Sequence, residues 1–401
     1  MLYNHFTEKL IGLQGIIVKN VYQNEKNTSI LIEMKKKPHK CPCCGCPKTT
    51  IHDYRKQIIK DIPAFGKHIV LILKKRRYSC SNCNKRFFED NAWLPRYHRI
   101  TNRLAAYIID KLSDVTSFTS VSKEVNLSVS TVIRIFDVVG SPKIDMPQVL
   151  SIDEFKGNTD GEKYQCIITD PVNKRILDVL PNRYKYSLFD YFKKFDRSKT
   201  THFVSDMWDT YRDLSKTYFK NASFIVDKYH FIRQVIWAFE AVRKEEQKRF
   251  AKTRRIYFKR SKSLLSKQYK YLNAEQKQQV DIMLYASEKL LEAYSLKELY
   301  FEFLNAENRQ EAKKLLSNWL LAAQNCKLPA FENCAKTMVN WSEGILNSFD
   351  CPYTNGFTEG VNNKIKVLKR NAYGYRNFER FRKRILHIFN NTSSKGTKNI
   401  K

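Results

Sequence analysis

The sequence contains no long apolar run. None of its 401 residues lies in a stretch of about 18 consecutive apolar residues, which is the length a membrane-spanning helix needs. The opening residues, MLYNHFTEKLIGLQGIIVKN, are interrupted by His5, Glu8, Lys9 and Gln14, so they do not have the pattern of a signal peptide. We therefore expect a cytoplasmic protein that does not work at a membrane.

Acidic residues are scarce relative to basic ones. The chain has 40 Asp plus Glu against 72 Lys plus Arg, which gives a formal net charge of +32. Each basic side chain that neutralises a phosphate releases a counterion, so this excess favours a polyanionic partner such as nucleic acid. The alternative is an ordinary solvated basic surface. A hydrophobic content of 42% and an aromatic content of 13% are sufficient for two to four packed units.

Cysteine is concentrated in one part of the chain, since six of the ten cysteines lie between positions 41 and 83. Two Cys-x-x-Cys pairs, Cys41 with Cys44 and Cys80 with Cys83, can offer four thiolates to one tetrahedral Zn²⁺, and the residues between the pairs can form the strands of a ribbon. We expect a zinc-ribbon DNA-binding domain over residues 1–95 with a structural zinc ion. Reduced, unliganded thiols are the alternative, and the rival ligands are Cys43, Cys46, His39 and His52.

A helical pattern follows over residues 96–145. The stretch SFTSVSKEVNLSVSTVIRIF has the apolar spacing of a helix-turn-helix, with Ser128 placed to cap its second helix. That helix would turn Ser130, Thr131 and Arg134 outward, where they could contact base edges and phosphates of DNA. An ordinary helical hairpin is the alternative.

The sequence from residue 146 to residue 228 has a mixed α/β pattern. Three runs, QVLSIDEF, EKYQCIITD and NKRILDVL, are separated by turn signals and predict a meander of antiparallel strands. A helix, a fourth strand in THFVSD, another helix and a fifth strand in ASFIVD follow. This order is typical of an RNase H-like, retroviral integrase-like core, so the expected fold class is multidomain α+β.

Three acids fall where this core would hold metal ions. Asp153 and Asp206 come at the ends of the first and fourth strands, and Glu359 lies on a helix whose apolar stripe would pack on the sheet. Three carboxylates suit two Mg²⁺ or Mn²⁺ ions about 3.5 to 4 Å apart, which catalyse phosphodiester chemistry without a side-chain nucleophile. Asp227, close to His230, is the main rival and a possible accessory pair; Glu154 and Asp209 are weaker rivals.

The rest of the chain is expected to be helical and basic. Residues 229–350 predict an all-α insertion, residues 351–390 the last part of the core with the Glu359 helix, and residues 391–401 a basic tail. From Lys364 to Lys401 there are twelve Lys or Arg against the single acid Glu379, so we expect this end to lie along DNA. The residues of the Glu359 helix proposed to contact DNA are Lys364, Lys366, Lys369 and Arg370.

Together these features resemble the ISL-three family of bacterial insertion-sequence transposases. The resemblance covers nearly the whole chain and rests on CPCC, CSNC, IDEF, VSDMWDTY, IVDKYHF and TNGFTEGVNNKIKVLKRNAYGYRNFERFRKRI. It implies a DDE catalytic triad of Asp153, Asp206 and Glu359 in an enzyme that binds terminal inverted repeats, cleaves the element ends and joins the 3′-hydroxyls to target DNA.

Such a reaction conserves phosphodiester bonds, and accordingly the sequence has no G-x-x-x-x-G-K-[ST] loop for a nucleotide. Two ends must be brought together, so we expect a homodimer or a higher oligomer on DNA, associated with the nucleoid. Two other functions remain open. One is a catalytically inactive DNA-binding regulator of the same fold, and the other is a structure-selective nuclease that hydrolyses strands without joining them.

Overall fold

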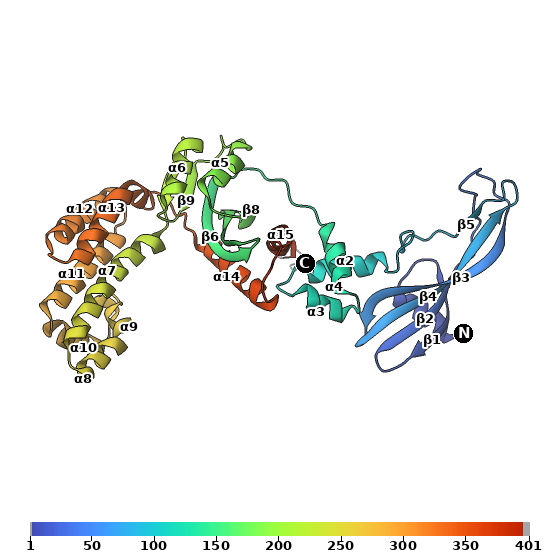
Figure 1. Cartoon of the computed structure of the whole chain (residues 1–401), viewed down its shortest axis with the longest axis horizontal. Coiled ribbons are helices and arrows are strands. Elements are labelled where there is room, and N and C mark those ends of the chain that lie inside the picture. Colours follow the sequence, from blue (N-terminus) through green and yellow to red (C-terminus); the bar gives the residue numbers. More distant parts are fainter. Residues whose placement is uncertain (1, 396–401) are drawn as a thin grey trace. The chain divides into compact units, whose positions relative to one another are not determined.

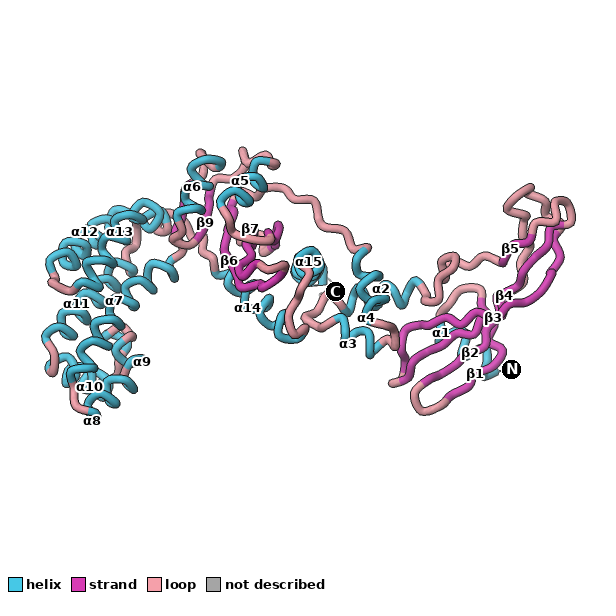
Figure 2. The backbone as a smooth tube through the Cα atoms, in the orientation of Figure 1, coloured by secondary structure: helices cyan, strands magenta, loops and turns pink. Residues whose placement is uncertain are grey.

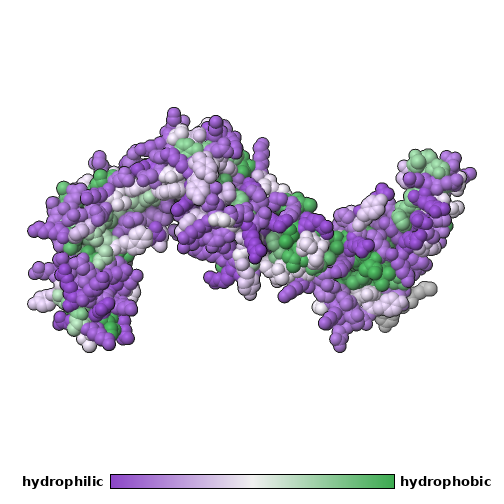
Figure 3. Space-filling model, viewed as in Figure 1, coloured by the Kyte–Doolittle hydropathy of each residue, from purple (hydrophilic) through white to green (hydrophobic). Residues whose placement is uncertain are grey.

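The computed structural model describes residues 2–395 and divides into two compact units. The first unit contains residues 1–141, 366–375 and 379–401, and the second contains residues 142–365 and 376–378. Figure 1 labels the elements of both. Among the described residues, no helix is long and apolar enough to cross a membrane. Hydrophilic residues cover much of the face shown in Figure 3.

The first unit begins with a helix and a five-stranded sheet. The elements are α1 (Leu2–Ile11), β1 (Ile16–Gln23), β2 (Asn27–Met34), β3 (Thr49–Ala64), β4 (Lys67–Cys80) and β5 (Arg86–Phe88). The strand order is β1-β2-β4-β3, with β5 paired to β4, and β2 runs parallel to β4. The long β3–β4 hairpin turns at Phe65 and Gly66, which both have positive φ, as a two-residue type I′ turn requires.

A hydrophobic core lies at one end of this sheet. Ile32, Ile59, Leu71 and Leu73 are fully buried there, because alternate residues of a strand face the same side. The other end of the hairpin carries the cysteines. The region predicted as one zinc ribbon, residues 1–95, therefore contains a hydrophobically packed sheet as well as the cysteine-bearing hairpin end.

Three short helices follow, as the helix-turn-helix pattern predicts. They are α2 (Asn102–Lys111), α3 (Phe118–Glu124) and α4 (Val129–Asp137). The side chain of Ser128 accepts a hydrogen bond from the Thr131 N–H, so the predicted cap of α4 is confirmed. The apolar positions Val121, Val125, Val132 and Phe136 are buried in a common core.

The last helix, α15 (Phe378–Lys395), packs on these three helices. His387 contacts the Phe136 ring and lies 2.8 Å from the Ile109 carbonyl oxygen, while the buried Arg384 donates to the carbonyls of Asp114 and Thr116. The predicted segment 351–390 is thus divided between the two units. Part of its basic charge, that of Arg384, is therefore buried in contacts within the protein and does not lie on a free surface. Residues 396–401 of the predicted tail fall outside the described residues.

The second unit has a mixed sheet in the predicted order. Its strands are β6 (Val149–Thr159), β7 (Glu162–Asp170), β8 (Arg175–Leu180), β9 (His202–Ser205) and β10 (Ser223–Val226), and its first helices are α5 (Lys185–Lys193) and α6 (Asp209–Tyr218). The sheet order is β10-β9-β6-β7-β8. The first three strands pair antiparallel, whereas β9 runs parallel to β6 and β10 parallel to β9.

After β10 the chain forms helices joined by short loops up to Asn347 (Figure 2). These are α7 (Lys228–Arg249), α8 (Lys252–Arg260), α9 (Lys262–Leu265), the 3₁₀ turn η1 (Tyr269–Tyr271), α10 (Ala274–Tyr285), α11 (Glu288–Leu304), α12 (Arg309–Asn325) and α13 (Pro329–Asn347). Asn273 caps α10. The next helix, α14 (Gly356–Asn371), returns to the sheet with Glu359 in its first turn.

Candidate active site

Two of the predicted acids lie on neighbouring parallel strands at the centre of the second sheet. Ser151 of β6 pairs with Val204 of β9. Asp153 and Asp206 each follow these residues by two positions, so the register brings them level and, with the two-residue period of a strand, to the same face. Asp206 comes directly after the last residue of β9, as predicted. Asp153 was expected at a strand end but lies inside β6, which continues to Thr159.

The two carboxyl groups share a buried, negatively charged environment. Burial, followed by the nearby charges of Glu154, Glu359 and Asp227, raises the pKa of Asp153 to about 7. Burial and then the charge of Asp153 raise the pKa of Asp206 to about 7. The Oδ1 atom of Asp206 is also buried without a hydrogen-bond partner. A pair of carboxylates that repel one another while one oxygen is unsatisfied is the environment that a bound cation would relieve.

Helix α14 is fixed against β6 by polar contacts as well as by its apolar stripe. Val361, Ile365 and Leu368 are buried, as the spacing predicted. On the polar side, the Ser151 hydroxyl donates to Asn355 Oδ1 and lies 3.0 Å from the hydroxyl of Thr358. These contacts place Glu359 near enough for its charge to raise the pKa of Asp153. Asp153 is thus close enough to both Asp206 and Glu359 for their charges to interact, whereas the described side chains whose ligand atoms lie within 4.8 Å of those of Glu359 and of one another are Asp227 and His230.

The rival acid Asp227 belongs to the same neighbourhood. It caps α7, where its carboxylate accepts from the backbone N–H of Tyr229, and it also accepts from the N–H of Asn355 at 2.9 Å. Ligand atoms of Asp227, His230 and Glu359 lie within 4.8 Å of one another. Asp227 thus connects the start of α7 with the segment before α14, and its N-cap role explains its burial without a metal.

The two weaker rivals have other partners. Glu154 forms a close ion pair with Arg183. Asp209 is exposed and pairs with Arg212 at 2.5 Å. Each of these acids is therefore paired with its own arginine.

Asn362 is a residue of this site that the sequence reasoning missed. Its side-chain amide donates to Asp153 Oδ2 at 2.9 Å, and its own Oδ1 is buried without a hydrogen-bond partner. It lies three residues after Glu359 and so on nearly the same face of α14. That spacing was visible in TEGVNN, but an uncharged amide gave no reason to select it over its neighbour Asn363.

Replacing Asn362 with alanine will leave Asp153 without its neutral donor. If Asp153 holds a divalent cation, any Mg²⁺-dependent activity of the chain should fall by about 10- to 100-fold, because groups that orient metal ligands have effects of this size. The exposed neighbour supplies the matched control, and Asn363→Ala should retain activity within about threefold. Equal losses in the two variants, measured as initial rates at saturating Mg²⁺, would contradict this role.

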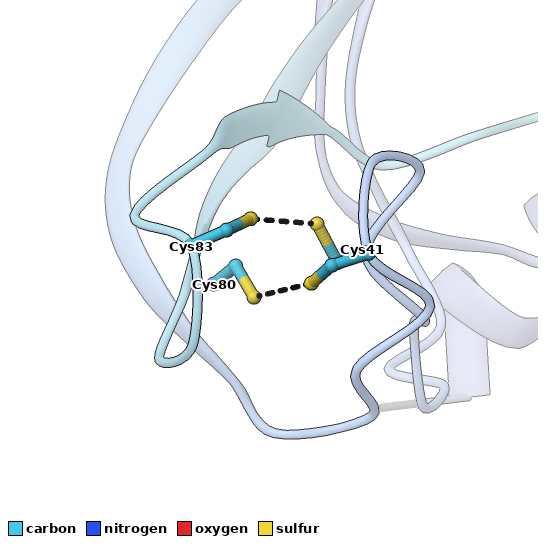
Figure 4. A group of neighbouring side chains, drawn as sticks. Cys41, Cys80 and Cys83 are labelled. Carbon is cyan, nitrogen blue, oxygen red and sulfur yellow. Dashed lines mark hydrogen bonds between the residues drawn. The ribbon is translucent and has the colours of Figure 1, made fainter.

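The four predicted cysteines come together at the open end of the β3–β4 hairpin, opposite its turn (Figure 4). The sulfurs of Cys41 and Cys83 are 3.5 Å apart, as are those of Cys44 and Cys80. A tetrahedral zinc ion with Zn–S bonds of about 2.3 Å needs sulfurs about 3.8 Å apart, so the spacing fits. Backbone N–H groups of Cys83 and Asn82 lower the pKa of Cys80 to about 6, which favours the thiolate that zinc binds.

The rival ligands lie outside this group of described cysteines. The Cys43 side chain is exposed, and the Cys46 sulfur lies 4.0 Å from the carbonyl oxygen of Lys48. His39 contacts the Tyr78 ring, and His52 is exposed.

The residues predicted to contact DNA lie on two helices. On α4, Ser130 and Arg134 are exposed and Thr131 is half-buried, with its hydroxyl 2.8 Å from that of Ser128. On α14, Lys366 and Arg370 are exposed, and Lys364 and Lys369 are half-buried. Both sets are accessible to a ligand, although Thr131 also takes part in the capping contacts of its own helix.

Comparison with known proteins gives three family matches along the chain. The model described as "Transposase", of the ISL3 DDE type, matches residues 150–385. A zinc finger of transposases IS204/IS1001/IS1096/IS1165 matches residues 37–83, and the helix-turn-helix domain of transposase family ISL3 matches residues 89–138. The first covers more than half of the chain and includes the three clustered acids.

Individual relatives agree with these matches. The transposase for insertion sequence element IS1001 of Bordetella parapertussis is 27% identical over 396 residues, which are 95% of this chain and 97% of that protein. The transposase for insertion sequence element IS1557 of Mycobacterium tuberculosis is 24% identical over 53% of this chain and 54% of that protein. A Lactococcus lactis protein named "ATP-dependent protease" is 37% identical over 111 residues, which are 27% of this chain and 33% of that protein.

Proposed function

This chain belongs to the ISL3 family of transposases, and we propose that it cleaves the ends of an insertion sequence and joins their 3′-hydroxyls to target DNA. The observation that carries the proposal is that Asp153 of β6 lies close enough to Asp206, at the end of β9, and to Glu359 of α14 for their charges to interact. The strand order β10-β9-β6-β7-β8 supports an RNase H-like core, with the helices α7 to α13 inserted before the last acid.

The three acids fit a divalent-cation site. The unsatisfied Asp206 Oδ1 and the raised pKa values of Asp153 and Asp206 support this fit, because Arg233 and Arg183 offset the negative charge around Asp206 only in part. In the proposal, Asp153, Asp206 and Glu359 hold two divalent ions, which are Mg²⁺ or Mn²⁺. When bound, such ions activate the attacking water or hydroxyl and stabilise the leaving oxygen.

The chain's own residues orient these ligands and hold the DNA. Asn362 donates to Asp153 and fixes the direction of its carboxylate. Ser151 and Thr358 join β6 to the start of α14, so Glu359 is supported by the sheet. In the proposal Lys364, Lys366, Lys369 and Arg370 of α14 contact phosphates of the strand being cut. No general base is required from the protein in this arrangement.

The first unit supplies DNA recognition in this proposal. Cys41, Cys44, Cys80 and Cys83 bind a structural Zn²⁺, and Ser130, Thr131 and Arg134 of α4 contact the terminal inverted repeats. Two DNA ends must be held together for joining, so we propose a homodimer or a higher oligomer in the DNA complex.

The decisive experiment supplies the full-length protein with two duplexes that carry the element's own ends, a supercoiled target plasmid and Mg²⁺. We expect both cleaved ends and strand-transfer products on a gel. Cleavage without joining would support a structure-selective nuclease instead. Binding of the ends with neither product, in protein whose fold is verified by circular dichroism, would support a catalytically inactive regulator.

The raised pKa values also predict how stability depends on pH. Below pH 3.8 Asp153 and Asp206 are protonated in the folded and unfolded states, and between pH 3.8 and about 7 only the unfolded chain has lost these protons. The metal-free protein should therefore lose stability as pH rises through this window and level off above it. Mg²⁺ should raise the melting temperature more at pH 8 than at pH 5.5, measured by scanning calorimetry. A Mg²⁺ effect independent of pH would contradict the assignment.

A further inference from the structure

A groove in the first unit is lined by basic residues from three different segments. Its volume is about 1180 Å³, and its lining includes Lys56 and Lys60 of β3, Arg99 of the connection to α2, and Arg134 of α4. Among the described residues that line it, none is acidic. Cationic walls with no compensating acid favour an anionic occupant. Helix α4, which is proposed to contact DNA bases, also borders the groove. The occupant must therefore be long enough to reach both the groove and this helix.

The loop of residues 95–99 forms one rim of this groove and is firmly anchored. The backbone N–H groups of Lys60 and Thr101 donate to the carbonyls of Arg99 and Lys60 at 2.9 and 3.1 Å, and Gln57 Nε2 donates to the carbonyl of His98 at 2.8 Å. Within the loop, the His98 N–H donates to the Pro95 carbonyl and closes a turn. On the amino side of the loop, the Trp93 carbonyl accepts from the Asn102 N–H at 3.0 Å. A loop fixed at both ends can present its side chains without a large ordering cost.

Tyr97 stands at the tip of this loop. It is 84% exposed, and its φ of 66° lies in the left-handed region that non-glycine residues rarely occupy. The Arg96 guanidinium lies 5.0 Å from the centre of the Tyr97 ring. The loop therefore displays a cation stacked on an aromatic ring, although burying that ring would stabilise the free protein. An exposed pair of this kind is typical of a surface that contacts a partner.

We propose that this groove receives the phosphate ridge of one strand of duplex DNA, and that the loop of residues 95–99 reaches over the ridge into the adjacent minor groove. The shared lining carries the inference. When α4 lies in a major groove, the next feature of the duplex is a phosphate ridge and the one after it is a minor groove. Arg134 of α4 and Tyr97 of the loop both line the basic groove, and the Arg96 guanidinium lies against the Tyr97 ring.

The inference rests on the proposed DNA-binding function and deepens it. It predicts a recognition surface made of the helix-turn-helix and the connecting loop together, with strand β3 contributing phosphate contacts. Sequence-independent contacts of Lys56 and Arg99 would position the protein, and the loop would report the shape of the minor groove.

Tyr97→Gly is the informative variant, because glycine removes the ring and is favoured at a positive φ, so the fold is retained. Tyr285→Ala is the control, since Tyr285 is 94% exposed and lies at the end of α10, for which no DNA contact is proposed. The probe is a duplex of about 40 base pairs that carries the element's own terminal inverted repeat, titrated with the full-length protein by fluorescence anisotropy without Mg²⁺. We expect about tenfold weaker binding for Tyr97→Gly and less than a twofold change for Tyr285→Ala.

Footprinting separates the two parts of the surface. Hydroxyl radicals report the minor groove, and dimethyl sulfate reports guanine N7 in the major groove. Tyr97→Gly should lose one protected minor-groove segment beside the helix-turn-helix footprint and keep the N7 protection. The slope of log affinity against log salt is negative, and Arg99→Ala should make it less steep by about 0.9.

The outcomes distinguish the inference from the function on which it rests. Failure of the wild-type protein to bind its repeats would overturn the proposed function itself. Normal wild-type binding, with an unchanged minor-groove footprint and affinity in Tyr97→Gly, would overturn only the role of the loop.

Discussion

Replacing Asp153 or Asp206 with asparagine will lower the rates of DNA cleavage and strand transfer by about 10³-fold or more while leaving DNA binding intact. The physical reason is that each change removes a charged ligand from the proposed cation site, and a loss of several kcal/mol of transition-state stabilisation corresponds to a factor of this size. Initial rates on paired ends, with Mg²⁺ saturating for the wild-type protein, are the measurement. The exposed Asp209 offers the matched control, and Asp209→Asn should retain nearly full activity.

The same two variants should be more stable than the wild-type protein when metal is absent. Asparagine removes a buried carboxylate whose ionisation is unfavourable, so we expect a gain of about 1–3 kcal/mol at pH 8 and little gain at pH 4. A loss of activity accompanied by lower stability at pH 8 would indicate that Asp153 and Asp206 support the fold rather than hold cations. The stability measurement therefore tests the site without relying on catalysis.

Replacing Cys80 with serine, or removing zinc with a strong chelator, will unfold the cysteine-bearing end of the β3–β4 hairpin. This end has no large apolar core, and the free energy of binding of a structural zinc, about 10 kcal/mol or more, stabilises such sites. The buried Ile32, Ile59, Leu71 and Leu73 lie at the other end of the sheet, so the rest of the unit should stay folded. Limited proteolysis should reveal new cleavage sites within residues 37–48.

The matched control for this prediction is Cys43→Ser, because Cys43 is exposed and outside the four-cysteine group. It should keep one zinc ion per chain by elemental analysis and the wild-type protease pattern. If Cys43→Ser and Cys80→Ser lose zinc equally, the ligand set proposed above is incorrect. Binding to the terminal repeat should fall at least about tenfold in Cys80→Ser and remain normal in Cys43→Ser if the hairpin end contacts DNA.

Features that depend on near neighbours could be predicted from the printed residues. Ser128 and Asn273 cap their helices because a short polar side chain reaches the N–H groups of the following turn. The order of strands and helices in the second unit also followed from local hydrophobic periodicity and turn signals. The acids Asp153, Asp206 and Glu359 were selected because each stands at a defined position of such an element.

Contacts between distant segments could not be predicted in the same way. The sequence of helix α15 predicts a basic surface helix, yet Arg384 is buried against the helix-turn-helix. The carbonyl groups of Asp114 and Thr116, which lie 270 and 268 positions earlier, accept hydrogen bonds from it there, and its guanidinium lies near the Phe136 ring. Asn362 is one of two consecutive asparagines, and only the packing of α14 on β6 directs it to Asp153. The residues around Tyr97 likewise carry no local pattern that predicts a position beside α4, and only the fold brings them there.

The sequence by itself thus determined which local elements form, which family the chain resembles and which chemical groups are available. These features depend on residue type and on spacing within a few turns of the chain. The folded arrangement alone decided which of those groups meet. Burial and the distances between side chains are properties of the packed chain, and they set the pKa of Asp153, the partner of Asn362 and the walls of the basic groove.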